Sequence, residues 1–386
     1  MKKNYYLDHG TATKPSNTAI HAMLPFFEEH YCLPHAPHGM GQSLLASMET
    51  SYKAIYALFG AKESDQFVFT SSGAEAITQV MNSVYKTVVR QSGKNHFVIS
   101  TTADAATLLA IAALEEEGCR SQLAAVSSRG YITPDAIAES ITPRTCLVSL
   151  SVSAPLTGVI QPLTEIAALC KQRAILLHVD VTQAIGKIFI NFDDLAADFI
   201  TFNGNQIQAP QGTGGLFARN IKLQPLIYGE EDTQRIHGGA LNVPGLIGLG
   251  QAALEADLNK NLYCTEVARL RDNFESQILA KYPEAILLFS EEDRLPHTTA
   301  IAFPGIRNES LLYTLSRKQL FATIGGGASQ QIEHILQASG VDPIIAKCAL
   351  SFTLSKETTL EEITQAITII SNAANRLRRL SRALYT

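Results

Sequence analysis

The sequence is poor in features that define several protein classes. Only six cysteines occur among 386 residues, and no two of them form a CxxC pair. Small disulfide-stapled proteins need far more cysteine, and thiols this scattered predict neither a metal centre nor disulfides in a reducing cytoplasm. Charged residues make up 17 % of the chain and hydrophobic residues 46 %. That balance excludes a disordered chain, which cannot bury enough apolar surface to fold.

Long apolar runs and excess positive charge are also missing. Lys2 and Lys3 precede no apolar segment, so we expect no signal peptide. The uncharged stretches 145–164 and 236–254 contain proline and several small or polar residues, which disfavours membrane-spanning helices. The net charge of -5 disfavours general nucleic-acid binding. We expect a cytoplasmic protein that binds neither membrane nor nucleic acid.

From about residue 65 the chain alternates short apolar runs with helical patterns. The expected strands are 66–70, 96–100, 122–127, 145–151, 174–179, 198–202 and 214–218, and the expected helices are 74–89, 105–117, 135–140 and 163–170. This alternation predicts an α/β fold with a mostly parallel sheet covered on both faces. After about residue 256, a long helical pattern, strands near 298–303 and 349–354 and a helix over 359–384 predict a smaller α+β domain.

Three segments follow strands whose carboxyl ends should meet at one crevice, where such sheets bind ligands. The first, Ser71–Glu75, opens a helix with small residues that leave backbone N–H groups free to hold a phosphate. Ser72 and Glu75 also have the spacing of a capping box, which would make the segment purely structural. Taken alone, this segment favours the structural interpretation.

The other two segments carry polar side chains just past a strand. Asp180 ends an apolar strand, where its carboxylate would either pair with a ring cation or cap the following turn. Residues 203–206 and 212–215 are rich in asparagine and glycine, which is typical both of a ligand crevice and of a plain turn. Neither segment decides the function by itself.

Together, in order and spacing, these segments resemble the cysteine desulfurases of the class V aminotransferase family, which depend on pyridoxal phosphate (PLP). The matching motifs are 6–13, Pro34, His38 with Gly41, 68–71, 178–183 with Gly186 and Lys187, 352–354 and 358–362. The resemblance covers the whole chain. It implies a PLP-transferase-like large domain over 15–255 with a seven-stranded sheet, and a small domain from 1–14 and 256–386. It also implies a homodimer and a sulfur-transfer or iron–sulfur assembly partner.

The positions that would carry the family's chemistry are occupied by other residues. The resemblance places Gln206 at the PLP lysine, Ser351 at the substrate-binding arginine and Gly325 near the sulfur-accepting cysteine. The sequence has no lysine between 187 and 222, no cysteine between 264 and 348, and no arginine between 317 and 376. A carboxamide cannot form a Schiff base, so the resemblance implies at most non-covalent PLP, or none.

The remaining cofactor positions are partly retained. Asp104 replaces the histidine that stacks on the ring, Ala74 a threonine at the phosphate, and Ala240 a threonine from the partner subunit, while 154–156 replace an Asn-Asn-Glu turn. The positions that the resemblance assigns to the cofactor are Ser72, Gly73, Ala74, Asp104, Asp180, Gln183, Asn203, Asn205 and Gln206.

We therefore predict a desulfurase-like pseudoenzyme that keeps a partner-binding or structural role. The alternative is an enzyme that uses the same crevice with non-covalent PLP or another phosphate ligand, with Asp104, Asp180, His178 and His237 as acid–base groups. A retained transferase reaction is a third hypothesis. In the homodimer, loop 234–240 would reach the partner's crevice, and the apolar stretch 241–248 would be buried between subunits or in the core of one.

Overall fold

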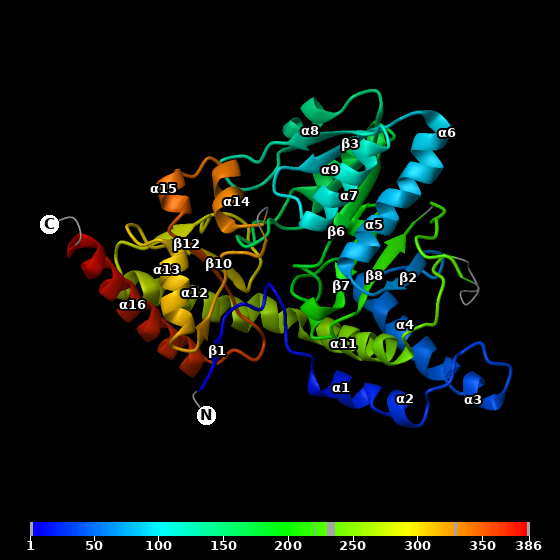
Figure 1. Cartoon of the computed structure of the whole chain (residues 1–386), viewed down its shortest axis with the longest axis horizontal. Helices are drawn as coiled ribbons and strands as arrows, with labels where there is room; N and C mark the ends of the chain where they lie inside the picture. The colour runs from blue at the N-terminus through cyan, green and yellow to red at the C-terminus, as the bar shows by residue number, and fades with distance from the viewer. Residues whose placement is uncertain (1–2, 220, 230–235, 328–329, 384–386) are drawn as a thin grey trace.

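A seven-stranded sheet forms the centre of the larger lobe (Figure 1). The computed structural model describes residues 3–219, 221–229, 236–327 and 330–383. In sheet order the strands are β2 (Gln66–Thr70), β8 (Gly214–Ala218), β7 (Phe199–Asn203), β6 (Leu176–Asp180), β5 (Thr145–Ser151), β3 (His96–Ser100) and β4 (Arg120–Ala124). Only β8 runs antiparallel to its neighbours, β2 and β7. The expected α/β fold with a mostly parallel seven-stranded sheet is confirmed.

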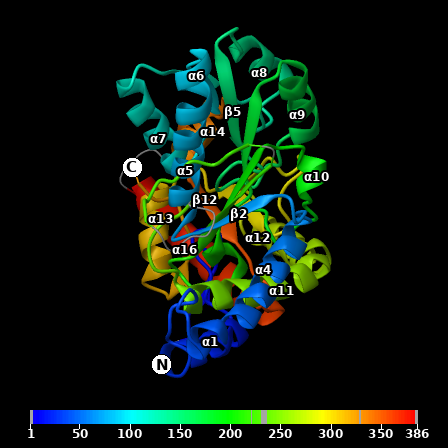
Figure 2. The same cartoon turned by 90° about the vertical axis from the view of Figure 1, so that its right-hand side faces the viewer.

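Helices cover both faces of this sheet (Figure 2). On one face lie α5 (Gly73–Val84) and α7 (Ala105–Glu116), and on the other α4 (Leu45–Phe59), α8 (Pro134–Ser140), α9 (Leu163–Gln172) and α11 (Val243–Leu262). Successive strand residues point to opposite faces, so Val98 packs into one core while Phe97 and Ile99 pack into the other. This explains the short apolar runs in the sequence, because a strand that helices cover on both faces has no face that must be polar.

Three strands begin elsewhere than expected, and one of them, β7, is shifted by a single residue from 198–202 to Phe199–Asn203. The strand expected over 122–127 is β4, Arg120–Ala124, since its parallel register with β3 starts at the pair His96 and Arg120. The strand expected over 174–179 is β6, Leu176–Asp180, because Ala174 has a φ of +51° and belongs to the turn after α9. The helix expected over 74–89 is α5 continued by a π-helical turn, Tyr85–Val89, and by α6 (Arg90–Ser92).

A second lobe packs around its own hydrophobic core. It contains the antiparallel strands β9 (Ile286–Leu288), β10 (Thr298–Ala302) and β12 (Ala349–Thr353), and the parallel pair β1 (Tyr5–Tyr6) and β11 (Leu320–Phe321). Its helices are α12 (Ala268–Lys281), α13 (Asn308–Ser316), α14 (Ile332–Ala338), α15 (Pro343–Ala346) and α16 (Leu360–Ala383). The domain boundaries given above stay a prediction.

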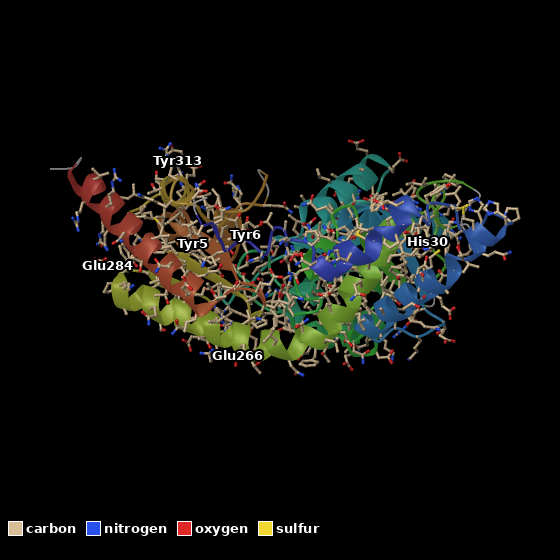
Figure 3. All side chains as sticks on the ribbon, turned by 90° about the horizontal axis from the view of Figure 1, so that it is seen from below. Tyr5, Tyr6, His30, Glu266, Glu284 and Tyr313 are labelled. Atoms are coloured by element: carbon tan, nitrogen blue, oxygen red, sulfur yellow. The ribbon has the colours of Figure 1, made fainter. Side chains whose placement is uncertain are left out.

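One long helical segment connects the lobes. Helix α11 continues through a π-helical turn, Tyr263–Val267, into α12, and Figure 3 shows this segment along the lower edge of the view, with Glu266 on its outer side. The other short helices are α1 (Asn17–Met23), α2 (Pro25–Glu28), α3 (Gly39–Gln42) and α10 (Phe192–Leu195). Within the described ranges, no helix combines the length and apolar character that crossing a membrane requires.

From Val243 on, the apolar stretch 241–248 is part of the core of one chain. Val243 and Leu246 at the start of α11 pack with α4 and the sheet. This agrees with the expectation that the stretch is buried in the core of one subunit. Within the expected loop 234–240, residues 234 and 235 lie outside the described residues.

Candidate functional site

A crevice lies between the two lobes at the carboxyl ends of the central strands. It encloses a cavity of about 270 Å³. Asp104, from the start of α7, and Gln330, from the loop after β11, meet across it with Gln330 Nε2 donating to Asp104 Oδ2 at 2.8 Å. On the same border Ser351 Oγ donates to the Leu156 carbonyl oxygen at 2.7 Å. Side chains of both lobes therefore close the cavity.

Most of the predicted site residues do gather here. The cavity is lined by Asp104, Gln183, Asn203, Asn205, Gln206, Gly325 and Ser351. Gly325 has a φ of +91°, and a Cβ there would approach the Gln330 carbonyl oxygen and the Leu156 side chain, so the loop requires glycine at this position. The predicted site residues that do not line the cavity are Ser72, Gly73, Ala74 and Asp180, although Gly73 packs beside Asn203.

Asp180 is a half-buried carboxyl held by donors on neighbouring elements. Its Oδ2 accepts from Thr201 Oγ1 at 2.9 Å and from Thr182 Oγ1 at 3.1 Å, and its Oδ1 accepts from the Thr182 backbone N–H at 3.1 Å. Burial raises the pKa of Asp180 to about 7, and the negative charge of Asp104 adds to this. The carboxyl caps the following turn through Thr182 and does not itself line the cavity, so the pairing of Asp180 with a ring cation stays a prediction.

His178 lies inside the sheet and away from the cavity. Its Nδ1 is 2.8 Å from Ser149 Oγ and its Nε2 is 2.9 Å from Thr201 Oγ1, and it is fully buried. Burial lowers the pKa of His178 to about 3, so the ring is neutral. The expectation that His178 acts as an acid–base group in the crevice does not agree with this position, because neighbouring strands cover it.

Gln206 lies over the buried amine of Lys187, a contact that was not expected. Lys187 Nζ donates to Gln206 Oε1 at 2.9 Å and to the Gln183 carbonyl oxygen at 3.3 Å. Burial lowers the pKa of Lys187 to about 7. The amide nitrogens of Gln183 and Gln206 both donate to the Gly10 carbonyl oxygen, at 3.0 and 2.8 Å. The one signal in the sequence was a single lysine within the apolar run 184–190.

The N-terminus of α5 is occupied by a carboxylate of the chain itself. Ser72 Oγ accepts from the Glu75 backbone N–H, as a capping residue does. Glu75 Oε2 accepts from the Ser71 backbone N–H at 2.7 Å and from Ser71 Oγ at 2.6 Å, while Glu75 Oε1 is 2.7 Å from His237 Nε2. The His237 hydrogen bond and the two from Ser71 lower the pKa of Glu75 to about 2. His237 thus lies against Glu75.

The comparisons with known proteins agree on one family. The family described as "Aminotransferase class-V" matches residues 5–365. A protein named "Cysteine desulfurase" from Nostoc sp. is 31 % identical over 380 residues, which cover 97 % of this chain and 94 % of the relative. Another of that name, from Gluconacetobacter diazotrophicus, is 32 % identical over 381 residues with the same two coverages. The chain therefore belongs to the class V aminotransferase family, and it is similar to cysteine desulfurases.

Solved structures show the same fold. A structure titled "NIFS-LIKE PROTEIN" superposes with a TM-score of 0.90 at 26 % identity, covering 97 % of this chain and 100 % of that one. The NifS-like protein from Rickettsia africae has a TM-score of 0.86 at 24 % identity, covering 97 % and 100 %, and supports the fold alone. The expected PLP-transferase-like fold is confirmed.

Family membership implies PLP, a cofactor that needs a partner for its ring nitrogen, donors for its phosphate and an amine for its aldehyde. Asp180 does not line the cavity, although its neighbour Thr182 does. The N–H of Ser71, which precedes the Ser72 cap of α5, is paired with the anionic Glu75. No lysine lines the cavity among the described residues, and Gln206 is hydrogen-bonded at both ends of its amide. The residues present do not fit the whole cofactor.

In the described part of the chain, no group of three or more His, Cys, Asp or Glu side chains is arranged to hold a metal ion. Two of the six cysteines, Cys32 and Cys264, have appreciable exposure, and neither lines the cavity.

Proposed function

We propose that this protein is a desulfurase-like pseudoenzyme that does not release sulfur from cysteine and retains a partner-binding or structural role. One observation carries the proposal: among the described residues that line the crevice there is no lysine, arginine or cysteine. The chemistry named for the relatives requires a nucleophile for sulfur and a group that holds the substrate carboxylate.

The residues at the family's chemical positions support the same proposal. Ser351 is fully buried and its hydroxyl donates to Leu156, so it offers no cation to a carboxylate. Gln206 is 3 % exposed, and its amide joins Lys187 to Gly10. Both side chains stabilise the contact between lobes, which is a structural task.

A homodimer is part of the proposal. A groove of about 1040 Å³ lies over α4 and β2 and continues to residues 239–242. Its walls include Leu45, Met48, Tyr52, Phe67 and Leu241, and Leu45 is 50 % exposed. Apolar and aromatic side chains of this kind are typical of interface cores, and the family resemblance implies that a second copy covers them. Light scattering at micromolar concentration should give the mass of two chains, and a monomer mass would refute the dimer.

The activity proposal is tested by two assays on the full chain. Purified protein supplied with PLP and cysteine should produce no sulfide or alanine above a control without enzyme. Borohydride treatment after PLP incubation should leave no pyridoxyl adduct in the mass spectrum. Sulfide production would overturn the proposal, and an adduct on a crevice residue would overturn the claim that the cofactor is not held covalently. An active cysteine desulfurase assayed in parallel shows that the conditions are adequate.

Gln206→Lys sharpens the test, with Gln206→Met as the matched control that has similar length and no amine. The new amine would lie close to Lys187 Nζ, and two amines in contact lower each other's pKa, which keeps the new one neutral and reactive. We expect borohydride to fix PLP at position 206 in Gln206→Lys but not in Gln206→Met. Neither variant should release sulfide, because no thiol or arginine has been restored.

A further inference from the structure

The junction between the two lobes combines polar contacts with a bend-prone helix. Each lobe packs around a hydrophobic core of its own. Backbone hydrogen bonds cross between the lobes, where the Ile160 N–H donates to the Asp293 carbonyl oxygen and the Leu295 N–H to the Gly158 carbonyl oxygen, both at 2.8 Å. The long helix that joins the lobes contains the π-helical turn Tyr263–Val267, and such turns are places where helices bend. This turn is therefore where one lobe can move against the other.

A histidine without hydrogen bonds is buried against this turn. His297 directly precedes β10 and is 0 % exposed, and among the described residues neither of its ring nitrogens has a hydrogen-bond partner. Its ring meets the Tyr263 ring edge-on, with centroids 5.8 Å apart. An unpaired polar group in the interior costs stability, so packing alone does not explain a histidine at this position.

Basic groups from both lobes face the His297 ring. Burial lowers the pKa of His297 well below its usual value, and the positive charges of Lys187, His9 and Arg271 lower it further. Lys187 belongs to the segment after β6, and Cys264 of the π-helical turn donates its Sγ–H to the Lys187 carbonyl oxygen at 3.5 Å. The turn, the histidine and the buried amine thus form one contact between the lobes.

The other two buried bases of this cluster are also held in a weakly basic state. Nδ1 of His9 is buried and unpaired, and burial together with Lys187 lowers the pKa of His9 to about 4, although Glu357 and Glu362 act in the opposite direction. Burial lowers the pKa of Lys187 to about 7. Contact between the lobes therefore disfavours the charged form of three groups at once.

From the π-helical turn, the unpaired ring of His297 and the basic groups around it, we propose that this junction is a proton-sensitive hinge, which keeps the lobes together while His297 is neutral and opens the crevice when His297 takes a proton. A charged ring beside other cations is stable only in contact with water, which the closed junction excludes.

The direction of the pH dependence follows from where His297 binds a proton more readily. In the open form the ring has the ordinary pKa of 6.5, whereas in the closed form its pKa is lower. The closed form is therefore favoured above pH 6.5, and opening becomes about tenfold more favourable for each pH unit below it. The inference goes beyond the proposed function, since it concerns movement of the lobes and needs no reaction in the crevice.

Hydrogen–deuterium exchange of the full chain measures this opening. The Ile160 and Leu295 amides bond across the junction, whereas Val179 lies in β6 inside the central sheet. After correction for the intrinsic exchange rate, exchange at Ile160 and Leu295 should rise about twentyfold from pH 6.0 to 4.5 for each histidine that takes a proton on opening, while Val179 stays protected. No rise at the two junction amides overturns the proposal, and so does an equal rise at Val179, which would mean that the whole chain unfolds.

His297→Phe separates protonation from packing, because phenylalanine keeps the edge-on contact with Tyr263 and cannot take a proton. The rise at Ile160 and Leu295 between the same two pH values should be about twentyfold smaller than in the wild type. His21→Phe, at an exposed position of α1, is the matched control and should keep the wild-type rise. His297→Gln, polar but unable to titrate, gives the same test if the phenylalanine variant does not fold. A wild-type rise in either His297 variant overturns the proposal, and if neither variant folds the wild-type comparison of junction with sheet decides it.

Discussion

Two helices of the larger lobe begin near the same crevice, and each carries a carboxylate at its N-terminus. At α5 the carboxylate is Glu75, which is held by Ser71 and His237 outside the cavity. At α7 it is Asp104, which caps its own helix and faces the cavity, where Gln330 of the other lobe reaches it. Both helix ends attract anions through their free N–H groups and dipole.

The difference between them lies in what is left for a ligand. At the α5 end, Glu75 is held by Ser71 and His237 and places a negative charge beside the helix N-terminus, outside the cavity. At the α7 end, Asp104 accepts from the Ala106 N–H and its carboxylate lines the cavity. The difference follows from the position of each carboxylate, since Glu75 lies in the first turn of α5 behind a serine cap, whereas Asp104 is itself the cap of α7.

Removing the charge at the α5 end should have the largest effect. Because the pKa of Glu75 is lowered from 4.5 to about 2, the ionised carboxylate stabilises the folded state above pH 4.5. This stabilisation is lost as the pH falls toward 2. Glu75→Gln should lose about 2 kcal/mol of unfolding free energy at pH 7, a value reduced for solvent screening of this partly buried group, and almost nothing near pH 2. Urea unfolding across this pH range measures it, with Glu139→Gln on the exposed surface of α8 as the control. An equal loss at both pH values would contradict the ionic origin.

Removing the Glu75 side chain from the N-terminus of α5 should restore a phosphate site. Glu75→Ala leaves the Ser71 N–H and hydroxyl without their acceptor. Inorganic phosphate at about ten times its Kd should then stabilise the variant by about 1.4 kcal/mol, while the wild type should gain nothing. Thermal unfolding with phosphate, compared with chloride at matched ionic strength, measures this gain. Equal stabilisation of both proteins would show that Glu75 does not block the site.

Removing the charge at the α7 end should change stability least. Asparagine caps a helix as well as aspartate, so Asp104→Asn should shift the unfolding free energy by no more than about 0.5 kcal/mol at pH 7.

The clearer result of the same substitution concerns Asp180, whose pKa is raised to about 7 by burial and also by Asp104. An acid whose pKa is raised on folding stabilises the folded state at pH values below its unfolded pKa of 3.8. This stabilisation is lost as the pH rises to about 7, the pKa in the folded state. Carboxyl ¹³C shifts should show the Asp180 pKa falling in the variant, and an unchanged pKa would mean that the two groups do not interact.

The same contrast separates what local sequence patterns can predict from what they cannot. The Ser72 cap was predictable because the capping hydroxyl and the N–H that donates to it, that of Glu75, are three positions apart in the chain. The second half of the expected box did not form, since the Glu75 carboxylate pairs with Ser71 and with His237, which is 162 residues away. Spacing along the chain holds no information about that histidine.

The sequence by itself determined the order of strands and helices and the family, and it carries the prediction that Gln206, Ser351 and Gly325 stand at the family's chemical positions. These follow from alternation of apolar residues, from motifs of a few residues and from residue identity, all of which are local. Only the tertiary structure decided that Lys187 lies under Gln206, that His178 is sealed inside the sheet, and that Gln330 meets Asp104 across 226 residues. Such contacts depend on which strands are neighbours and on where side chains point after packing. The sheet order that sets both is a property of the whole fold.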